Sequence, residues 1–172
     1  MELVVLIGLP GSGKSSFQRD RYAGTHVHVS KDLLGKAQRK EERALPATGG
    51  ARMRGATKDE KQMRLVETAL RTGHSVVVDN TNPRRADRAP LIEIARRLGA
   101  TTTGILLVAP VAECLRRNAA REGKARVPAV AIYVVARKLE PPSREEGFDE
   151  VFEARRSEDG SWSVTPIPPP QT

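Results

Sequence analysis

The sequence predicts an α/β domain: a parallel sheet of about five strands sandwiched by helices, with a β-hairpin near the C-terminal end. Two observations carry this prediction. Strand patterns and helix patterns alternate along the chain, as they do in successive βαβ units. The first pattern, residues 3–7, is a near-continuous apolar run, which is typical of a strand covered on both faces.

The first half of the chain divides into elements with recognisable ends. Ser30 can cap a helix that starts at the next residue, and Met63, Val66 and Leu70 recur at helical spacing. Residues 44–57 contain Pro, Gly and Arg without periodicity and are interpreted as a mobile basic loop. The expected elements are strands at 3–7, 26–29 and 75–79 and helices at 14–22, 31–43 and 58–72.

The second half continues the alternation and then changes to a hairpin. Pro83 and Gly99 mark the two ends of one helix, and Val127-Pro128 opens another. The expected elements are helices at 83–98, 111–122 and 128–139, a strand at 103–108 and hairpin strands at 149–154 and 161–165. We expect residues 1–166 to form a single domain and residues 167–172 to form a Pro-rich tail.

The composition excludes several classes of protein. With 172 residues, 38% hydrophobic and 29% charged, the chain is neither disordered nor fibrous. It contains no run of about 20 apolar residues, and Met1 leads directly into the first strand pattern without a signal segment. Its single cysteine, Cys114, excludes an internal disulfide. These features predict a cytoplasmic protein that does not enter a membrane.

The charge is unevenly distributed along the chain. Residues 1–139 carry 26 basic and 13 acidic side chains, whereas residues 140–172 carry 3 and 8. Such a field favours a polyanionic partner, a nucleic acid or a nucleotide, because phosphates release counterions to Lys and Arg. The alternative is an ordinary surface of interspersed charges in an Arg-rich protein, since 21 of the 29 basic residues are Arg.

A phosphate-binding motif follows the first strand. Residues 8–15, GLPGSGKS, fit G-x-x-x-x-G-K-[ST] with a strand before and a helix after, as in a P-loop. Glycines let backbone N–H groups turn towards phosphate oxygens, and the helix directs its positive end to the same anion. Lys14 is expected to reach the β- and γ-phosphates of ATP, and the Ser15 hydroxyl to bind Mg²⁺. The predicted nucleotide-binding residues of this segment are Gly8, Pro10, Gly11, Ser12, Gly13, Lys14, Ser15 and Ser16.

Two acidic residues follow other strand patterns. Asp79 ends a buried strand in VVVDNTNP, at the carboxyl edge where α/β sheets bind ligands, and it suits Mg²⁺ held directly or through water. Asp32 lies just after the second strand, where its carboxylate could accept the proton of an attacking hydroxyl. The structural alternatives are a helix-capping role for Asp79 and a helix-N-terminal role for Asp32.

A pair of arginines forms the third feature. Arg117 and Arg121 are four residues apart and are expected to share one face of a helix. Two guanidinium groups over a triphosphate could neutralise charge on the transferring group, which would make this helix a lid. A basic surface helix without a catalytic role is the alternative.

Taken together, these motifs resemble the 5′-hydroxyl polynucleotide kinase family, in particular the kinase half of bifunctional polynucleotide kinase–phosphatase repair enzymes. The resemblance covers roughly residues 3–150. It rests on GLPGSGKSSF, HVHVSKDLLGKAQR, VVVDNTNP, LRRNAAREGK, VPAVAIYVVARKLEPPS and EEGF, in that order.

The resemblance implies transfer of the ATP γ-phosphate to the 5′-OH end of DNA or RNA. By this resemblance Asp32 is the general base, Lys14 and Ser15 hold the phosphates and Mg²⁺, and Asp79 supports the site. Arg117 and Arg121 match the lid arginines. The expected substrate-binding residues are Asp32, Lys36, Asp79, Asn80, Thr81 and Asn82.

The sequence also departs from that family. Gly35 stands where some members carry an Arg that contacts the substrate phosphate, so Lys36 or Arg39 is the candidate replacement. Loop 44–57 is longer than expected, and its Arg52 and Arg54 are candidates to bind the strand. A D-x-D-G-T phosphatase motif is absent, so a separate phosphatase or ligase is a possible partner.

Two other functions remain open at this point. A P-loop kinase of a small metabolite or nucleoside would use the same phosphate chemistry with a closed acceptor pocket. An ATP-gated binding module would need Asp32 to be structural. Trp162 is expected to pack the terminal hairpin.

Overall fold

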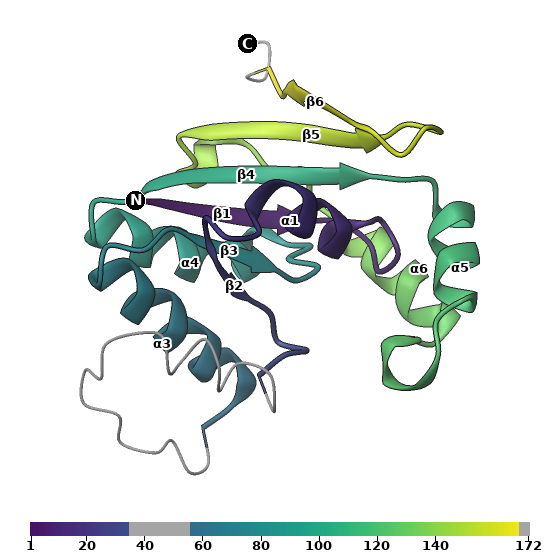
Figure 1. Ribbon diagram of the computed structural model, residues 1–172, viewed down its shortest axis with the longest axis horizontal. Helices are drawn as coiled ribbons and strands as arrows, with labels where there is room; N and C mark the ends of the chain where they lie inside the picture. Colours follow the sequence, from purple (N-terminus) through teal and green to yellow (C-terminus); the bar gives the residue numbers. More distant parts are fainter. Residues whose placement is uncertain (35–55, 169–172) are drawn as a thin grey trace.

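The computed structural model describes residues 1–34 and 56–168, and its six described strands form one sheet in the order β2-β3-β1-β4-β5-β6 (Figure 1). The first five strands in this order run parallel, and β6 pairs antiparallel with β5. The predicted α/β class is therefore confirmed, and the first strand of the predicted hairpin is the fifth strand of the parallel sheet. The strands are β1 (Glu2–Ile7), β2 (Val27–Val29), β3 (Val76–Asp79), β4 (Thr101–Val108), β5 (Glu150–Arg156) and β6 (Trp162–Pro166).

The middle of the sheet is the apolar run that opens the sequence. Residues 3–7 of β1 are fully buried. Because side chains alternate along a strand, Leu3 and Val5 pack into the core on one face while Val4 and Leu6 pack into the core on the other. A central strand covered on both faces is what the uninterrupted apolar pattern predicted.

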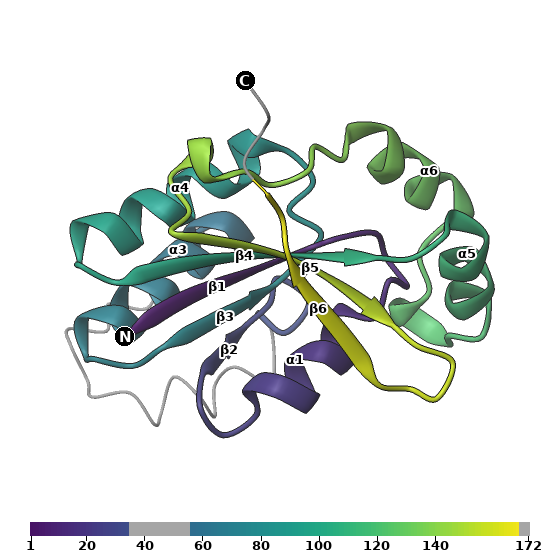
Figure 2. The ribbon, with the colours of Figure 1, turned by 90° about the horizontal axis from the view of Figure 1, so that it is seen from above.

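Helices cover both faces of the sheet, as Figures 1 and 2 show. On one face, α3 (Lys58–Arg71) and α4 (Arg85–Arg97) contribute Val66 and Leu91 to the core around Leu3 and Val5. On the other face, α1 (Lys14–Tyr22) contributes Phe17 to the core around Val4 and Leu6. A third cluster joins Leu9, Cys114 and Ile132, where α5 (Val111–Ala119) packs against α6 (Ala129–Lys138). These last two helices lie past the carboxyl ends of the central strands (Figure 1).

The start of α3 has a local cause. Thr57 and Glu60 form a capping box: the Glu60 N–H donates to Thr57 Oγ1 at 3.2 Å, and the Thr57 N–H donates to Glu60 Oε2 at 2.7 Å. The predicted helix at 58–72 begins at the same residue as α3 and extends one residue beyond its last residue. Residues 44–55 of the predicted loop lie outside the described residues.

The helix predicted from Lys31 is wrong at its start. Residues 31–34 form a turn instead, with the Leu33 N–H donating to the Ser30 carbonyl at 3.1 Å and the Asp32 N–H donating to Ser30 Oγ at 3.3 Å. Ser30 therefore caps, as predicted, but it caps a turn. Residues 35–43 of that predicted helix lie outside the described residues.

The helix predicted at 111–122 ends earlier, at Ala119. Its last buried residue, Asn118, turns its side-chain amide to the backbone of Val127, with Asn118 Nδ2 donating to Val127 O at 2.8 Å and Val127 N donating to Asn118 Oδ1 at 3.0 Å. This double hydrogen bond draws the following segment back across the helix end. Arg117 and Arg121 consequently do not share a helix, because Arg121 follows the last helical turn. None of the helices in the described part of the chain is long and apolar enough to cross a membrane.

Candidate active site

The loop of residues 8–15 is held between β1 and α1 by close contacts that only glycine allows. Gly11 has φ 86°, and a Cβ there would lie 2.6 Å from the carbonyl oxygen of Cys114 on α5. Gly13 has φ 102°, and a Cβ there would lie 2.9 Å from Cη2 of Trp162 on β6. The loop therefore has α5 on one side and β6 on the other, and its conformation is fixed by elements far away in sequence.

The loop fits an anion. Ser12 Oγ is buried and has no hydrogen-bond partner, and Lys14 Nζ donates to the carbonyl oxygens of Gly8 at 3.0 Å and Leu9 at 2.8 Å. Burial lowers the pKa of Lys14 to about 8; nearby Asp79 opposes this shift and Arg121 adds to it. A buried amine and an unpaired buried hydroxyl in one loop are suited to bind a negatively charged phosphate, which would satisfy both.

Asp79 and Ser15 form a second part of the site. The Ser15 hydroxyl donates to Asp79 Oδ2 at 2.7 Å, and His28 Nε2 lies 3.4 Å from the same oxygen. Burial raises the pKa of Asp79, but His28, Ser15 and Lys14 outweigh it and leave the pKa below its ordinary value. An ionised carboxylate beside a hydroxyl supplies the oxygen ligands that Mg²⁺ prefers.

This pair alone would not enclose a metal. In residues 1–34 and 56–168, no group of three or more His, Cys, Asp or Glu side chains is arranged to hold an ion. Mg²⁺ in phosphate-transferring sites is commonly bound by one or two protein oxygens, with substrate phosphates and water completing its shell. Ser15 and Asp79 fit that kind of site.

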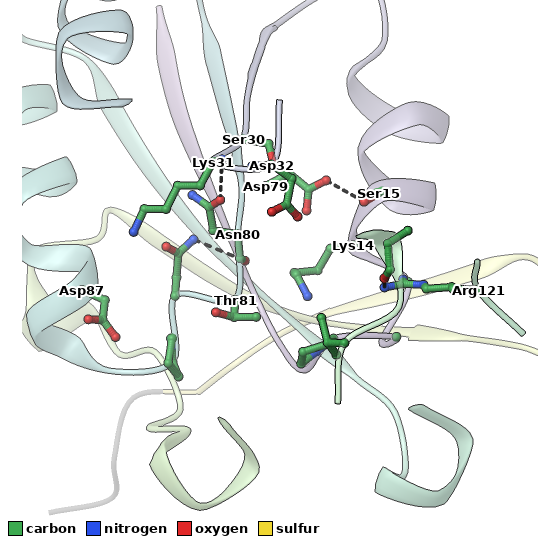
Figure 3. Close-up of a pocket in the computed structure, with 17 residues that line it drawn as sticks. Lys14, Ser15, Ser30, Lys31, Asp32, Asp79, Asn80, Thr81, Asp87 and Arg121 are labelled. Carbon is green, nitrogen blue, oxygen red and sulfur yellow. Dashed lines mark hydrogen bonds between the residues drawn. The ribbon is translucent and has the colours of Figure 1, made fainter. Parts of the chain in front are cut away.

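A cavity of about 490 Å³ opens at the carboxyl ends of the strands (Figure 3). The sheet order explains its contents, because β2, β3 and β1 are neighbours and Asp32, Asp79 and Lys14 follow or end these three strands. Both carboxylates are near enough to Lys14 to raise its pKa. The cavity is lined by Pro10, Gly11, Gly13, Lys14, Ser15, Ser30, Lys31, Asp32, Asp79, Asn80, Thr81, Asn82, Pro83, Asp87, Arg121, Ala125 and Val127.

The segment after Asp79 joins the loop to its surroundings. The Gly8 N–H donates to the Thr81 carbonyl at 3.1 Å, and Asn82 Nδ2 donates to the Leu6 carbonyl at 2.8 Å. Asn82 is buried and has φ 42°, a conformation that Asn tolerates better than most residues. Asn80 receives the Lys31 N–H on Oδ1 at 2.9 Å. Asn80, Thr81 and Asn82 line the cavity, and these hydrogen bonds hold its wall together.

The two predicted lid arginines occupy different places. Arg121 lines the cavity. Arg117 is outside its lining: it donates to the Gly11 carbonyl at 3.2 Å and forms an ion pair with Glu113, so it braces the loop from α5. Gly8, Ser12 and Ser16 also lie outside the lining, although Gly8 and Ser12 belong to the loop itself, and Lys36 lies outside the described residues.

The positions of two residues near the site were not anticipated. Asp87 lines the cavity from the first turn of α4, where the Arg84 guanidinium holds its carboxylate with contacts of 3.0 and 3.3 Å. The position of Asp87, four residues after Pro83, is typical of an acidic residue in the first turn of a helix, and the sequence did not indicate a catalytic role for it. Trp162 packs against Phe17 with ring centroids 5.0 Å apart and donates to Asp20 at 3.0 Å. It therefore anchors the hairpin to α1 and the loop.

The fold and this loop define a P-loop kinase-like protein, a class whose fold implies nucleotide binding. The chain belongs to the AAA domain family, whose model matches residues 3–142. A bifunctional polynucleotide phosphatase/kinase of Schizosaccharomyces pombe is 26% identical over 94% of this chain. The alignment covers 36% of that relative, so the chain spans about a third of its length.

Solved structures of other P-loop proteins share the fold. A gluconokinase from Sinorhizobium meliloti 1021 matches with a TM-score of 0.57 and 22% identity, covering 90% of this chain and 82% of that one. Kti12 of Chaetomium thermophilum, in complex with ADP-AlF3, matches with a TM-score of 0.61 and 15% identity, covering 92% of both chains. At these identities the likeness establishes the fold alone.

Proposed function

We propose that the chain is an ATP-dependent polynucleotide kinase that phosphorylates 5′-hydroxyl ends of DNA or RNA. The observation that carries the proposal is one cavity that is lined by Asp32 together with Lys14, Ser15 and Asp79. The polynucleotide acceptor is supported by the S. pombe relative and by the excess of basic residues over residues 1–139.

In this proposal, each residue of the cavity has a separate role in phosphoryl transfer. ATP would supply the γ-phosphoryl group, and Ser15 and Asp79 would hold a Mg²⁺ ion, which would offset negative charge on its phosphates. Lys14 exchanges its two carbonyl partners for phosphate oxygens, whose negative charge stabilises the charged form of the amine. Asp32 accepts the proton of the acceptor hydroxyl, which makes that oxygen a better nucleophile. Arg121 adds positive charge on the donor side of the cavity.

The part of the cavity proposed to receive the acceptor, which we call the acceptor half and which includes Asp32 and Asp87, also favours a second candidate. This candidate is a kinase of a small hydroxylated metabolite. Asp32 and Asp87 line the same cavity, and carboxylates accept hydrogen bonds from several hydroxyls of one sugar or polyol. The cavity of about 490 Å³ has the size of an ordinary small-molecule site.

The test is transfer of labelled γ-phosphate from ATP, with Mg²⁺, to 5′-OH oligonucleotides of DNA and RNA and to a panel of neutral sugars and polyols. We expect labelling of an oligonucleotide, and competition by matched 5′-phosphorylated strands that is weaker than competition by 5′-OH strands. Labelling of a sugar alone would refute the polynucleotide acceptor and support the second candidate.

The Asp32→Asn variant tests the proposed base. We expect nucleotide affinity to change less than about twofold while the transfer rate falls by about 10²–10⁴, the usual contribution of general base catalysis. Equilibrium dialysis with labelled ATP and single-turnover transfer measure the two quantities separately. Transfer at the wild-type rate would leave Asp32 with a structural role only, as an ATP-gated binding module requires.

A further inference from the structure

We infer that Gln62 of α3 is a positioning residue that sets the place of Asp32 through Asn80 and the backbone of Lys31. The inference rests on the proposed function, because it gives Asp32 the role of the base. Gln62 has no part in the chemistry described above, and it lies outside the lining of the cavity. It is nevertheless almost completely buried, with 1% of its surface exposed.

The link consists of two hydrogen bonds between side-chain amides and backbone. Asn80 Nδ2 donates to Gln62 Oε1 at 2.6 Å, and Asn80 Oδ1 accepts the Lys31 N–H at 2.9 Å. Figure 3 shows the second bond, which joins the end of β3 to the turn after β2. Through Asn80, a residue in the second turn of α3 thus holds the turn that carries Asp32.

The Lys31 N–H determines which group donates and which accepts in both hydrogen bonds of this link. The Lys31 N–H can only donate, so Asn80 must present its oxygen to it and its NH2 group to Gln62. Gln62 must then present an oxygen. Among buried side chains of this size, only Gln or Glu completes the link, which explains a polar residue at a position of α3 that otherwise faces the apolar core.

The link also fixes the spacing between the two acids of the site. Asn80 directly follows Asp79, and Lys31 directly precedes Asp32. The hydrogen bond between Asn80 and Lys31 therefore limits the distance between the two acids. Lys31 Nζ forms a second contact to α3, at 2.6 Å from Asp59, but both of those side chains are exposed and water competes with such pairs. Gln62 therefore provides a buried, hydrogen-bonded connection between α3 and the turn that carries the base.

The experiment compares two substitutions of Gln62 in single-turnover transfer. Gln62→Leu removes the acceptor oxygen, and we expect the transfer rate to fall by about 10- to 100-fold, the usual cost of misplacing a reacting group by about 1 Å, with the KM for ATP changed less than twofold. Gln62→Glu keeps an acceptor oxygen, and we expect its rate to stay within about threefold of wild type. A rate for Gln62→Glu as low as that of Gln62→Leu would overturn the inference.

Thr102→Val is the matched control. Thr102 is another buried polar residue, 2% exposed, which donates to Asp149 near the opposite end of the sheet. We expect this variant to melt at a lower temperature without a change in transfer rate well below its melting point. A loss of rate in Gln62→Leu no larger than in Thr102→Val would show that Gln62 serves stability alone and would overturn the inference.

Hydrogen exchange separates this inference from the proposed function. The Lys31 amide is protected by Asn80, so Gln62→Leu should speed its exchange, while Thr102→Val should not. Unchanged protection would overturn the link even in an active enzyme. If wild-type protein phosphorylates no acceptor, the proposed function fails and the positioning role falls with it, while exchange at Lys31 still decides whether the link exists.

Discussion

Raising the pH should weaken nucleotide binding through Lys14. In the free protein its pKa is about 8, because burial removes the ammonium group from water. Binding of phosphates requires the charged form, so the free protein must take up a proton when it binds ATP above that pH. Below pH 8 the group is already charged, and the effect disappears.

The size of the effect follows from the pKa. With a pKa of about 8 in the free protein and an ordinary value near 10.5 in the complex, the fraction of charged Lys14 falls about tenfold between pH 7 and pH 9. The dissociation constant for ATP should therefore rise about tenfold over this range, and binding at pH 9 should take up close to one proton.

Isothermal titration calorimetry in two buffers with different ionisation enthalpies measures both quantities. Lys14→Met provides the control, since it keeps a long unbranched side chain without a titrating group and should bind ATP more weakly but without this pH dependence. Equal affinity at pH 7 and pH 9, with no proton uptake in the wild-type protein, would refute the reasoning. It would mean that the carbonyls of Gly8 and Leu9 keep Lys14 charged in the free protein.

Further outcomes follow from the contacts around the loop. Gly13→Ala should reduce ATP affinity by at least about tenfold, because its Cβ would lie 2.9 Å from Trp162 and its φ of 102° strains any other residue; dialysis with labelled ATP checks this, and a wild-type affinity would contradict it. Arg121→Ala should lower the transfer rate by about 10²-fold with little effect on stability, since Arg121 lines the cavity. Arg117→Ala should act mainly on ATP affinity, because Arg117 braces the Gly11 carbonyl; steady-state kinetics with varied ATP separates the two, and identical kinetic defects would argue against this division.

The parts of the molecule that the sequence predicted are those with local causes. The strand β1 was predicted from an uninterrupted apolar run and α3 from an apolar stripe, and the capping box that begins α3 is equally local, although it was not used in the prediction. The phosphate loop is likewise contained in residues 8–15. Each of these patterns involves residues that are close together in the sequence, so it can be recognised without knowledge of the structure.

The parts that could not be predicted depend on contacts between distant residues. Asn118 ends α5 by bonding Val127, and an asparagine in a helical pattern does not indicate such a partner. Trp162 reaches α1 across more than a hundred residues, so the sequence offered only the hairpin as its neighbour. In the sequence, Gln62 is indistinguishable from any other polar residue of a helix, and only the structure shows that its oxygen accepts a hydrogen bond from Asn80.

The same distinction explains why the donor of the phosphate is easier to infer than the acceptor. Lys14 and Ser15 are adjacent and belong to one motif, whereas the acceptor half of the cavity combines Asp32 from a turn with Asp87 from the first turn of α4. Of these two carboxylates, Asp87 is paired with Arg84, so Asp32 is the one proposed to meet a group that enters as a neutral hydroxyl and leaves as a phosphate ester. If the proposed function holds, the negative charge of Asp32 favours the neutral hydroxyl over the phosphate ester at this place, so we expect Asp32 to promote proton removal and to weaken retention of the phosphorylated end.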